Sequence, residues 1–574
     1  MKSQSCSTIS YLCLYLTNNL SYPEMKILWL DINSSYSHSS VALPAIHAQV
    51  MDRSDWEWCV VRGTINDDPG SLAAQVSEQR PDIIAATFWL FTHQMQIEVL
   101  SRAVRLLGSP EVVCGGPEFL GNNEDFLRTH PFITAIIRGE GEVALPRFLE
   151  TADRHDWSSI EGLCWISDDG AYHDNGIARV SDFASLRYPE ESSFFSWDKP
   201  FVQLETTRGC FNSCSFCVSA GEKPVRYQTL DQVKCRLENI SSHGIKDVRV
   251  LDRTFNYDIE RASRMLEIFT QYAGKMRFHL EIHPALIPGQ LQSRLAELPD
   301  GLLHLEAGIQ SLDTDVLRLC GRKGSMESSL KGLNYLTSLD NLETHADLIA
   351  GLPSYTLEML VRDIISLISI GVDELQIESL KVLPGTRMRE CADKLGIIYS
   401  PLPPYEILKT ESMSPSDLRY AMKLSRVIDL YYNSQAWQKV FTDLVIENSD
   451  FIRNFTAYLD QIMVLNSPLS QERRGDILYE YCSVHHQHIL TDISIAWIEA
   501  GYSLHKKPAG EIIKVKNLHA EFIEKNIRIN ILYGTDDNTH RYFFLKSSAG
   551  GYLVGYDSQQ HKPSPIFMAE VQYI

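Results

Sequence analysis

Three cysteines in one short stretch constrain this chain more than any other feature. Cys210, Cys214 and Cys217 have the spacing Cys-x3-Cys-x2-Cys, and they follow an apolar segment, residues 201–206, with the pattern of a strand. Three thiolates on one loop can bind three irons of a [4Fe–4S] cluster, which leaves the fourth iron open for a substrate or a cofactor. Because the loop follows a strand, we expect it at the end of an α/β barrel where active sites lie.

Two alternatives to a cluster are a zinc site and a set of ordinary buried cysteines. Structural zinc takes four ligands, usually from two Cys-x2-Cys pairs, and the sequence contains no second pair. Isolated cysteines are expected to be small core residues, and those after residue 25 are Cys59, Cys114, Cys164, Cys235, Cys320, Cys391 and Cys482. The spacing therefore favours the cluster.

Strand and helix patterns alternate around the cysteine loop, in residues 201–400. The helix after the loop begins at Thr229-x-x-Gln232, a capping box, and ends at Gly244. The expected strands are residues 201–206, 247–252, 277–282, 303–307, 344–349 and 374–380. Such alternation is typical of a parallel α/β sheet.

The remainder of the chain divides into further regions. Residues 25–150 contain strand–helix units that predict a doubly wound parallel sheet, with strands at 26–31, 57–61, 82–87, 111–114 and 134–137. We interpret residues 1–24 as a leader or an incorrectly assigned start, and residues 151–200 as a connector. Residues 401–574 predict a mainly helical α+β domain, with a helix at 417–432 and strands at 527–533, 541–546 and 551–556.

Composition excludes several classes of function. The formal net charge of −20 argues against a nucleic-acid-binding surface, which would be basic. No apolar run approaches the about 20 residues that span a bilayer, and residues 9–16 lack the cleavage site of a signal peptide. Free thiols together with an iron–sulfur loop predict a reducing cytoplasm.

The cysteine loop resembles that of the radical S-adenosylmethionine (radical SAM) superfamily in its spacing and in the aromatic residue, Phe216, before the third cysteine. The resemblance implies a partial (β/α)6 barrel that is open on one side. It also implies that SAM binds the open iron of a [4Fe–4S] cluster and is cleaved reductively to a 5′-deoxyadenosyl radical.

The ends of the later strands resemble those of oxygen-independent coproporphyrinogen oxidase and other radical SAM enzymes. This similarity assigns Glu281 to the SAM amino group, Gln310 and Asp347 to the ribose hydroxyls, and Arg322 to the carboxylate. Leu383, in the segment that closes the sixth strand, is also expected to contact the cofactor. Taken singly, Glu281 and Asp347 read as strand-end caps and Arg322 as a surface residue. Their order on successive strands favours SAM.

The end of the second strand departs from the superfamily. A glycine-glycine-glutamate run is common at this place, but the chain has Asp252-Arg253-Thr254-Phe255-Asn256. Asp252 and Asn256 are therefore candidates for contacts with SAM or with the substrate at the barrel mouth.

An amino-terminal doubly wound domain before such a barrel resembles the subclass with a cobalamin-binding domain. That subclass has similar loops to those at Gly115-Gly116 and at Gly139-Glu140. Glycines at strand ends let the backbone approach a flat ligand. The Asp-x-His-x-x-Gly motif that supplies histidine to cobalt in other cobalamin proteins is absent. The alternative is a domain without cofactor.

The domain order, the loop at 34–38 and the carboxyl-terminal region resemble radical SAM proteins with a DUF4080 domain.

These resemblances imply an enzyme, with cobalamin-dependent methyl transfer to an unactivated carbon as the leading hypothesis. The alternative is radical SAM oxidation, rearrangement or cyclisation without methyl transfer. A tRNA methylthiotransferase would need three more cysteines in a domain that has only Cys59 and Cys114, and a regulatory sensor would not need the cluster loop. We expect a small-molecule or peptide substrate and a reductase such as flavodoxin or ferredoxin, with neither nucleic acid nor membrane as a partner.

Overall fold

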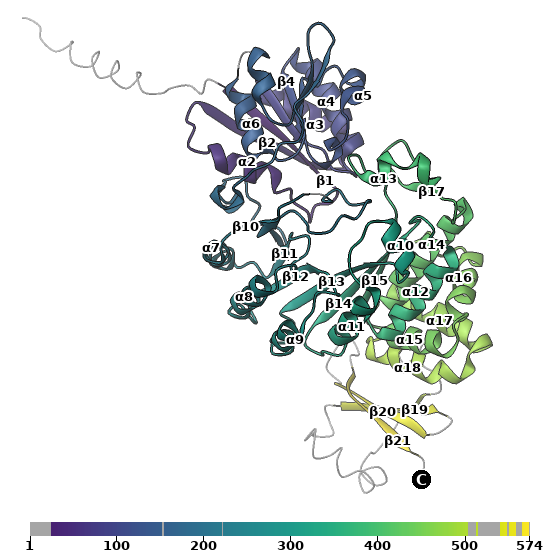
Figure 1. Cartoon of the computed structure of the whole chain (residues 1–574). Coiled ribbons are helices and arrows are strands. Elements are labelled where there is room, and N and C mark those ends of the chain that lie inside the picture. The colour runs from purple at the N-terminus through teal and green to yellow at the C-terminus, as the bar shows by residue number, and fades with distance from the viewer. Residues whose placement is uncertain are drawn as a thin grey trace, which may run out of the picture. The chain divides into compact units, whose positions relative to one another are not determined.

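The computed structural model describes residues 25–151, 154–220, 222–502, 512–514, 540–547, 550–557 and 565–572 (Figure 1). The predictions for residues 1–24 and for a strand at 527–533 lie outside these ranges. The chain forms two compact units. The first comprises Met1–Glu343, Gly351–Tyr355 and Ser379–Ser414, and the second comprises Thr344–Ala350, Thr356–Glu378 and Pro415–Ile574.

The amino-terminal part of the first unit contains a seven-stranded sheet in the order β2-β1-β3-β4-β5-β6-β7. The five predicted strands are present and parallel. They are β1 (Met25–Asn33), β2 (Trp56–Thr64), β3 (Ile83–Thr87), β4 (Glu111–Gly115) and β5 (Ala135–Ile137). The strand order reverses at β1, and ligands bind at such switch points.

Two antiparallel strands extend this sheet from residues that the sequence placed in a connector. They are β6 (Leu163–Ile166) and β7 (Tyr172–Asp174), which pair with each other and, through β6, with β5. The turn predicted at Asp168-Asp169-Gly170 joins them, and Gly170 takes a positive φ of 83° there. Residues 151–200 thus contribute structure to the sheet.

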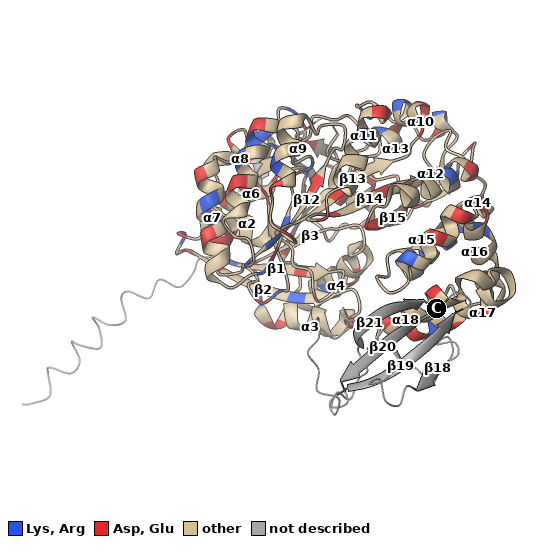
Figure 2. Ribbon diagram, turned by 90° about the horizontal axis from the view of Figure 1, so that it is seen from below, with Lys and Arg blue, Asp and Glu red and all other residues tan. Residues whose placement is uncertain are grey.

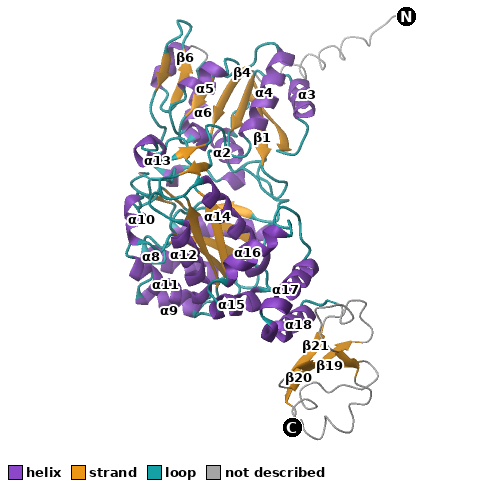
Figure 3. Cartoon of the chain, turned by 90° about the vertical axis from the view of Figure 1, so that its right-hand side faces the viewer, coloured by secondary structure: helices purple, strands orange, loops and turns teal. Residues whose placement is uncertain are grey.

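Helices cover both faces of this sheet (Figure 3). Alternation along β1 divides the core, because Leu28 and Leu30 pack on one face whereas Ile27 and Trp29 pack on the other. The first face is covered by α3 (Pro69–Gln79), α4 (His93–Leu107) and α5 (Glu124–Thr129), and the second by α2 (Ala42–Val50) and α6 (Gly141–Glu150).

Four parallel strands of the predicted barrel follow within the first unit, in the order β13-β12-β11-β8. They are β8 (Val202–Leu204), β11 (Asp247–Val250), β12 (Arg277–Ile282) and β13 (Leu303–Gln310). The helices between and after them are α7 (Leu230–Ser242), α8 (Ile259–Thr270), α9 (Gly289–Ala296), α10 (Thr314–Leu319) and α11 (Met326–Thr337). The capping box predicted at Thr229 and Gln232 is present at the start of α7.

A two-stranded antiparallel ribbon carries the cysteine loop between β8 and α7. Its strands are β9 (Thr207–Arg208) and β10 (Arg226–Tyr227). The first unit also includes α13 (Arg387–Glu390), β16 (Ile398–Tyr399) and β17 (Ile407–Lys409). Acidic and basic residues are interspersed along α7 and α8 (Figure 2), so these helices present no basic stripe for nucleic-acid phosphates.

The second unit holds all but one residue of each of the fifth and sixth predicted strands, β14 (Glu343–Ala350) and β15 (Glu374–Ser379), with α12 (Leu357–Ile370) between them. Its helices are α14 (Pro415–Val427), α15 (Gln438–Glu447), α16 (Phe451–Gln461), α17 (Gln471–His485) and α18 (Leu490–Glu499), and a π-helical turn spans Ile428–Tyr432. A four-stranded sheet is formed by β18 (Ile512–Lys514), β19 (His540–Ser547), β20 (Gly550–Asp557) and β21 (Pro565–Gln572). No helix in the described part of the chain is long and apolar enough to cross a membrane.

Side chains from the carboxyl-terminal helices cap the edge of β15, the last strand in its sheet. The Asn433 amide accepts a hydrogen bond from Leu375 N at 3.0 Å and donates one to Leu375 O at 2.9 Å. Ser425 Oγ donates to Ile377 O, and Gln438 Nε2 donates to Asp373 O. An exposed strand edge presents unpaired backbone groups, and these side chains satisfy them where another strand would otherwise pair.

Replacing Asn433 by alanine is expected to lower the free energy of unfolding by about 1–3 kcal/mol, because both backbone groups of Leu375 lose their partner. Hydrogen exchange should rise along β15. Asn448→Ala, which removes a side chain that accepts from Asp450 N outside this edge, is the matched control. Unchanged exchange of the Leu375 amide in Asn433→Ala would contradict the capping role.

Candidate active site

The cysteine loop begins at a close approach of two backbone segments. Gly209 has a φ of +101°, and a Cβ there would lie 2.4 Å from Glu222 O. Cys210 N donates to the same carbonyl oxygen at 3.2 Å. Only glycine tolerates this geometry without strain, so Gly209 fixes the direction in which the loop leaves the ribbon.

The three thiols of the loop influence one another and lie beside two arginines. Burial raises the pKa of the Cys214 and Cys217 thiols, whereas Arg322 near Cys214 and Arg253 near Cys217 oppose the rise. Iron binding requires thiolates and therefore releases protons, and the arginines favour that form. Three soft sulfur donors with this electrostatic support fit an iron–sulfur cluster.

Cys320 also lies near Cys214 and was expected in the core. It is fully buried, and burial raises the pKa of its thiol to about 12. Cys320 is therefore a core residue beside the loop.

The segment that carries Arg322 is bound to the cysteine loop by backbone contacts. Ser215 N donates to Cys320 O at 2.7 Å, and Lys323 N donates to Asn212 Oδ1 at 2.9 Å. Arg322 Nη1 consequently lies 3.7 Å from Cys214 Sγ, and Nη2 donates to Gly308 O. The cation predicted to hold the SAM carboxylate thus lies next to a predicted cluster ligand, although 108 residues separate them in the sequence.

Gln310 and Glu281 lie at the ends of neighbouring strands of the same sheet. Gln310 takes an unusual positive φ of 69°, and a Cβ on Gly308 would come within 2.6 Å of its Nε2. The Glu281 carboxylate is 40% exposed and lies 3.9 Å from Arg253. Thr254 Oγ1 lies 3.8 Å from Cys210 Sγ. The strand ends therefore bring polar side chains to the loop, as a SAM site requires.

Asp252 and Asn256 are used inside the protein. The Asp252 carboxylate, 2% exposed, accepts hydrogen bonds from Thr206 N, Thr206 Oγ1 and Thr207 N, and burial raises its pKa. Asn256, 1% exposed, is bonded to both backbone groups of His283. These contacts favour a role for both residues in holding the strand ends rather than in touching SAM.

The remaining candidates lie in different places. Phe216 is partly buried in the cysteine loop. Asp347 lies on β14 of the second unit, with Oδ1 3.1 Å from His345 Nε2. Leu383 lines a cavity of the first unit. The SAM roles of these residues stay predictions.

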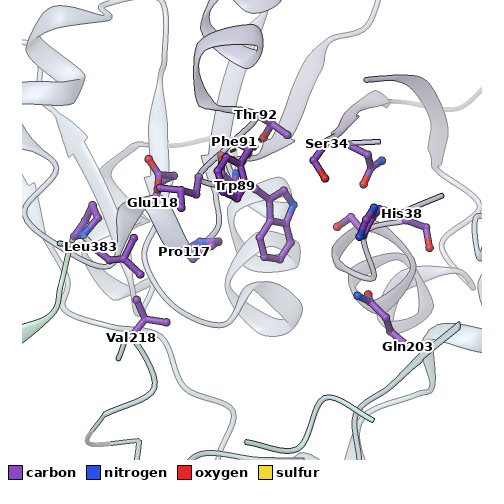
Figure 4. Close-up of a pocket in the computed structure, with 15 residues that line it drawn as sticks. Ser34, His38, Trp89, Phe91, Thr92, Pro117, Glu118, Gln203, Val218 and Leu383 are labelled. Atoms are coloured by element: carbon purple, nitrogen blue, oxygen red, sulfur yellow. Dashed lines mark hydrogen bonds between the residues drawn. The ribbon is translucent and has the colours of Figure 1, made fainter. Parts of the chain in front are cut away.

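This cavity has a volume of about 340 Å³ and lies at the ends of β1, β3 and β4 (Figure 4). Trp89 lies between Ser34 and His38 on one side and Glu118 and Leu383 on the other. Its lining residues are Asn33, Ser34, His38, Ser39, Ser40, Trp89, Leu90, Phe91, Thr92, Pro117, Glu118, Gln203, Val218, Leu383 and Pro384. Since Val218 follows Cys217 directly, the cavity borders the cysteine loop.

A second cavity of about 140 Å³ shares Trp89 and Pro117 with the first and is lined by residues of β1, β3, β4 and β5. Gly115, Gly116 and Gly139 line it. Gly116 and Gly139 are needed by the protein itself, because a Cβ would lie 2.6 Å from Phe88 O and 2.4 Å from Ala178 O, respectively. Gly115 differs, because the nearest atom to its Cβ would be Ile137 O at 3.5 Å.

Glu140 is absent from the linings of both cavities. Its carboxylate instead forms ion pairs with Arg208 and Arg226 of the ribbon, at 3.1 and 2.6 Å. Despite burial, these arginines hold the pKa of Glu140 below its usual value. The contacts therefore favour a role for Glu140 at the ribbon over a cofactor contact.

Sequence reasoning gave no role to Arg253 or Trp89. Arg253 follows a strand end and lies between Asp252 and Asn256, two predicted site residues. A cation at that position was the signal that could have identified it. Trp89 follows β3 within Phe88-Trp89-Leu90-Phe91, and it is 39% exposed. Exposed apolar residues that cluster after a strand end are a signal for an interaction site or a ligand-binding groove.

Comparisons with known families agree with this geometry. Residues 204–366 match the radical SAM superfamily, and residues 393–524 match a protein family of unknown function, DUF4080. The chain therefore carries a radical SAM domain followed by a DUF4080 domain, which confirms the expected membership.

Two curated relatives are methyltransferases. The chain is 25% identical over 346 residues to the cobalamin-dependent radical SAM methyltransferase TokK of Streptomyces tokunonensis, covering 55% of this chain and 50% of the relative. It is 24% identical to 2-(S-pantetheinyl)-carbapenam-3-carboxylate methyltransferase of Streptantibioticus cattleyicolor, covering 56% and 49%. The chain thus spans about half the length of these relatives.

Two solved structures share the fold. TsrM of Kitasatospora setae, with cobalamin and a [4Fe–4S] cluster bound, has a TM-score of 0.54 at 17% identity, covering 69% of this chain and 81% of that chain. OxsB with aqua-cobalamin has a TM-score of 0.57 at 14% identity, covering 82% and 79%. The predicted fold class, a doubly wound domain with a radical SAM barrel and a helical carboxyl-terminal region, is confirmed.

Proposed function

We propose that the protein is a cobalamin-dependent radical SAM methyltransferase acting on an unactivated carbon. The observation that carries the proposal is the cysteine loop, with Arg322 Nη1 3.7 Å from Cys214 Sγ, bordered by a cavity at the switch point of a doubly wound domain. When bound, the cluster and SAM supply a 5′-deoxyadenosyl radical and cobalamin supplies a methyl group. The relative TokK is a cobalamin-dependent radical SAM methyltransferase, which supports the same chemistry. The structural neighbour TsrM is a radical SAM methyltransferase that was solved with cobalamin bound.

The residues at the loop bind and orient. Cys210, Cys214 and Cys217 would hold three irons, and Arg322 would pair with the SAM carboxylate. Glu281 and Gln310 offer oxygen acceptors at adjacent strand ends for the amino group and a ribose hydroxyl. Arg253 is close enough to Glu281 to compete for its carboxylate, so SAM binding would release this exposed ion pair.

Two adjoining cavities of the doubly wound domain are available for part of a large ligand. The larger cavity has apolar walls from Trp89 and Leu383 and a polar side from Ser34 and His38. The smaller cavity continues past Trp89 between strand ends and is lined largely by glycine, alanine and other apolar residues. We propose that cobalamin binds at this place and that part of it enters the smaller cavity.

Gly115→Leu is expected to lower cobalamin retention at least about tenfold, because its side chain would enter the smaller cavity without straining the backbone. Iron content and SAM binding should stay unchanged. The measurement is cobalamin per chain by absorbance after anaerobic reconstitution. Gly116→Val is a poor test, because its Cβ would collide with Phe88 whether or not a ligand binds.

Gly289→Leu is the matched control for this experiment, since a Cβ at Gly289 meets no atom within 4 Å. Retention in Gly115→Leu equal to that of the wild type would remove the smaller cavity from the cofactor site. A wild-type protein with an intact cluster that takes up no cobalamin would defeat the methyltransferase proposal.

Single-turnover product analysis separates the candidate reactions. Methyl transfer yields S-adenosylhomocysteine together with 5′-deoxyadenosine, whereas oxidation, rearrangement or cyclisation yields 5′-deoxyadenosine alone. A sensor yields neither product. We propose a small-molecule or peptide substrate, a reductase such as flavodoxin or ferredoxin as the electron donor, and a cytoplasmic location.

A further inference from the structure

The acidic motif at the start of α6 contacts the ribbon that carries the cysteine loop. Gly139-Glu140-Gly141-Glu142 belongs to the doubly wound domain, and its resemblance to cofactor loops suggested a ligand contact. Both glutamates instead turn to arginines of the ribbon. They lie 66 to 86 residues before these arginines in the sequence.

Glu140 contacts both strands of the ribbon. Its Oε1 accepts from Arg226 Nη2 at 2.6 Å, and its Oε2 accepts from Arg226 Nη1 at 2.9 Å. Oε2 also accepts from Arg208 Nη1 at 3.1 Å and from Val180 N at 2.8 Å. A bidentate guanidinium–carboxylate pair fixes orientation as well as distance, so the position of β10 follows that of Glu140.

Arg208 is the second node of this network. Its Nη2 donates to Glu142 Oε1 at 2.8 Å and to Glu205 Oε2 at 2.7 Å, and its Nε donates to Glu205 Oε1 at 2.9 Å. These carboxylates hold the pKa of Arg208 above its usual value in spite of burial. Arg208 precedes Cys210, the first cysteine, by two residues.

The ribbon itself is too small to hold the loop. Each strand contributes two residues to the pairing of Thr207 with Tyr227 and of Arg208 with Arg226, and isolated two-stranded ribbons are marginal even when longer. The side chains of Glu140, Glu142, Arg208 and Arg226 are each only 9–14% exposed. Removing one charge from such a buried network leaves its partner without compensation.

We propose that Glu140 and Glu142 are positioning residues for the cysteine loop, acting through Arg208 and Arg226. The doubly wound domain therefore stabilises the cluster site of the barrel as well as forming cavities of its own. The inference rests on the cluster of the proposed function and is independent of cobalamin. It assigns the acidic motif to the cluster ribbon instead of to the cofactor.

The test compares Glu140→Gln with the wild type after anaerobic reconstitution with iron and sulfide. Iron loss to an added chelator should become about tenfold faster, as expected for loss of one charge-assisted contact. Hydrogen exchange should rise across β9 and β10 and stay unchanged in β11. Cobalamin retention should equal that of the wild type. Glu124→Gln, which removes an exposed ion pair with Arg128 in the same domain, is the matched control.

A double-mutant cycle tests whether Glu140 acts through Arg226. Glu140→Gln combined with Arg226→Gln should lose iron no faster than the worse single variant. Arg226→Lys keeps the charge and loses the bidentate fork, so it should lose iron at an intermediate rate. This variant replaces Glu140→Gln in the test if Glu140→Gln does not fold.

The outcomes separate this inference from the proposed function. If Glu140→Gln retains less cobalamin but shows unchanged iron loss and unchanged hydrogen exchange in β9 and β10, the inference is overturned. The acidic motif would then be assigned to the cobalamin site. Additive effects in the cycle would also overturn it. A wild-type chain that binds no iron defeats the proposed function, and exchange across β9 and β10 still reports on the positioning role.

Discussion

Replacing Cys210, Cys214 and Cys217 together by alanine is expected to reduce the iron content from about four per chain to none. The three thiols are the soft donors of the loop, and Cys320, another cysteine near Cys214, is fully buried. Anaerobic reconstitution followed by iron analysis measures the change. The reduced wild type should show an electron paramagnetic resonance signal that shifts on addition of SAM, and the variant should show none.

A control separates loss of ligands from loss of fold. Cys235→Ala replaces a cysteine on α7 that is exposed, so the expectation of a core position was wrong for it. This variant should keep full iron content. The melting temperature of the triple variant without iron should match that of the wild-type apoprotein. Iron content in the triple variant equal to that of the wild type would refute the cluster assignment.

Arg322→Ala is expected to weaken SAM binding by about 1.5–3 kcal/mol, because the carboxylate loses a charge-assisted contact. Titration calorimetry of the reconstituted protein measures this change. The iron content should change little, since Arg322 contacts Cys214 at 3.7 Å without being a ligand. Arg322→Lys should recover part of the affinity, because lysine keeps the charge and loses the fork.

Arg318→Ala is the matched control, because Arg318 lies on α10 nearby, with a side chain 73% exposed and paired with Asp315. Its SAM affinity should equal that of the wild type.

Asp347→Ala is expected to weaken binding through the ribose. Wild-type affinity in both Arg322→Ala and Asp347→Ala would remove the residue assignments taken from coproporphyrinogen oxidase.

Features of short range were predictable from the sequence. The cysteine spacing, the capping box at Thr229 and the alternation along β1 each depend on residues within one loop, one helical turn or one strand. The five parallel strands of the first sheet and the radical SAM domain follow from such patterns. The domain boundaries at residues 200 and 400 stay predictions, whereas β6 and β7 extend the first sheet beyond residue 150.

Long-range partners decided the roles of several candidate residues. Asp252 and Asn256 stand at a strand end, as a ligand contact would, yet their polar atoms bond to Thr206, Thr207 and His283. Whether a strand-end carboxylate faces a ligand or a neighbouring loop depends on packing between elements, which the sequence pattern does not encode.

The acidic motif and the glycines show most clearly what the sequence determined and what the tertiary structure decided. The sequence by itself determined that Gly116 and Glu140 lie in loops after parallel strands, because strand periodicity sets where each strand ends. Only the tertiary structure decided that Gly116 makes room for Phe88 and that Glu140 pairs with Arg226, 86 residues away. Backbone approach and charge pairing are set by distances in space, and those distances exist only once the domains have packed.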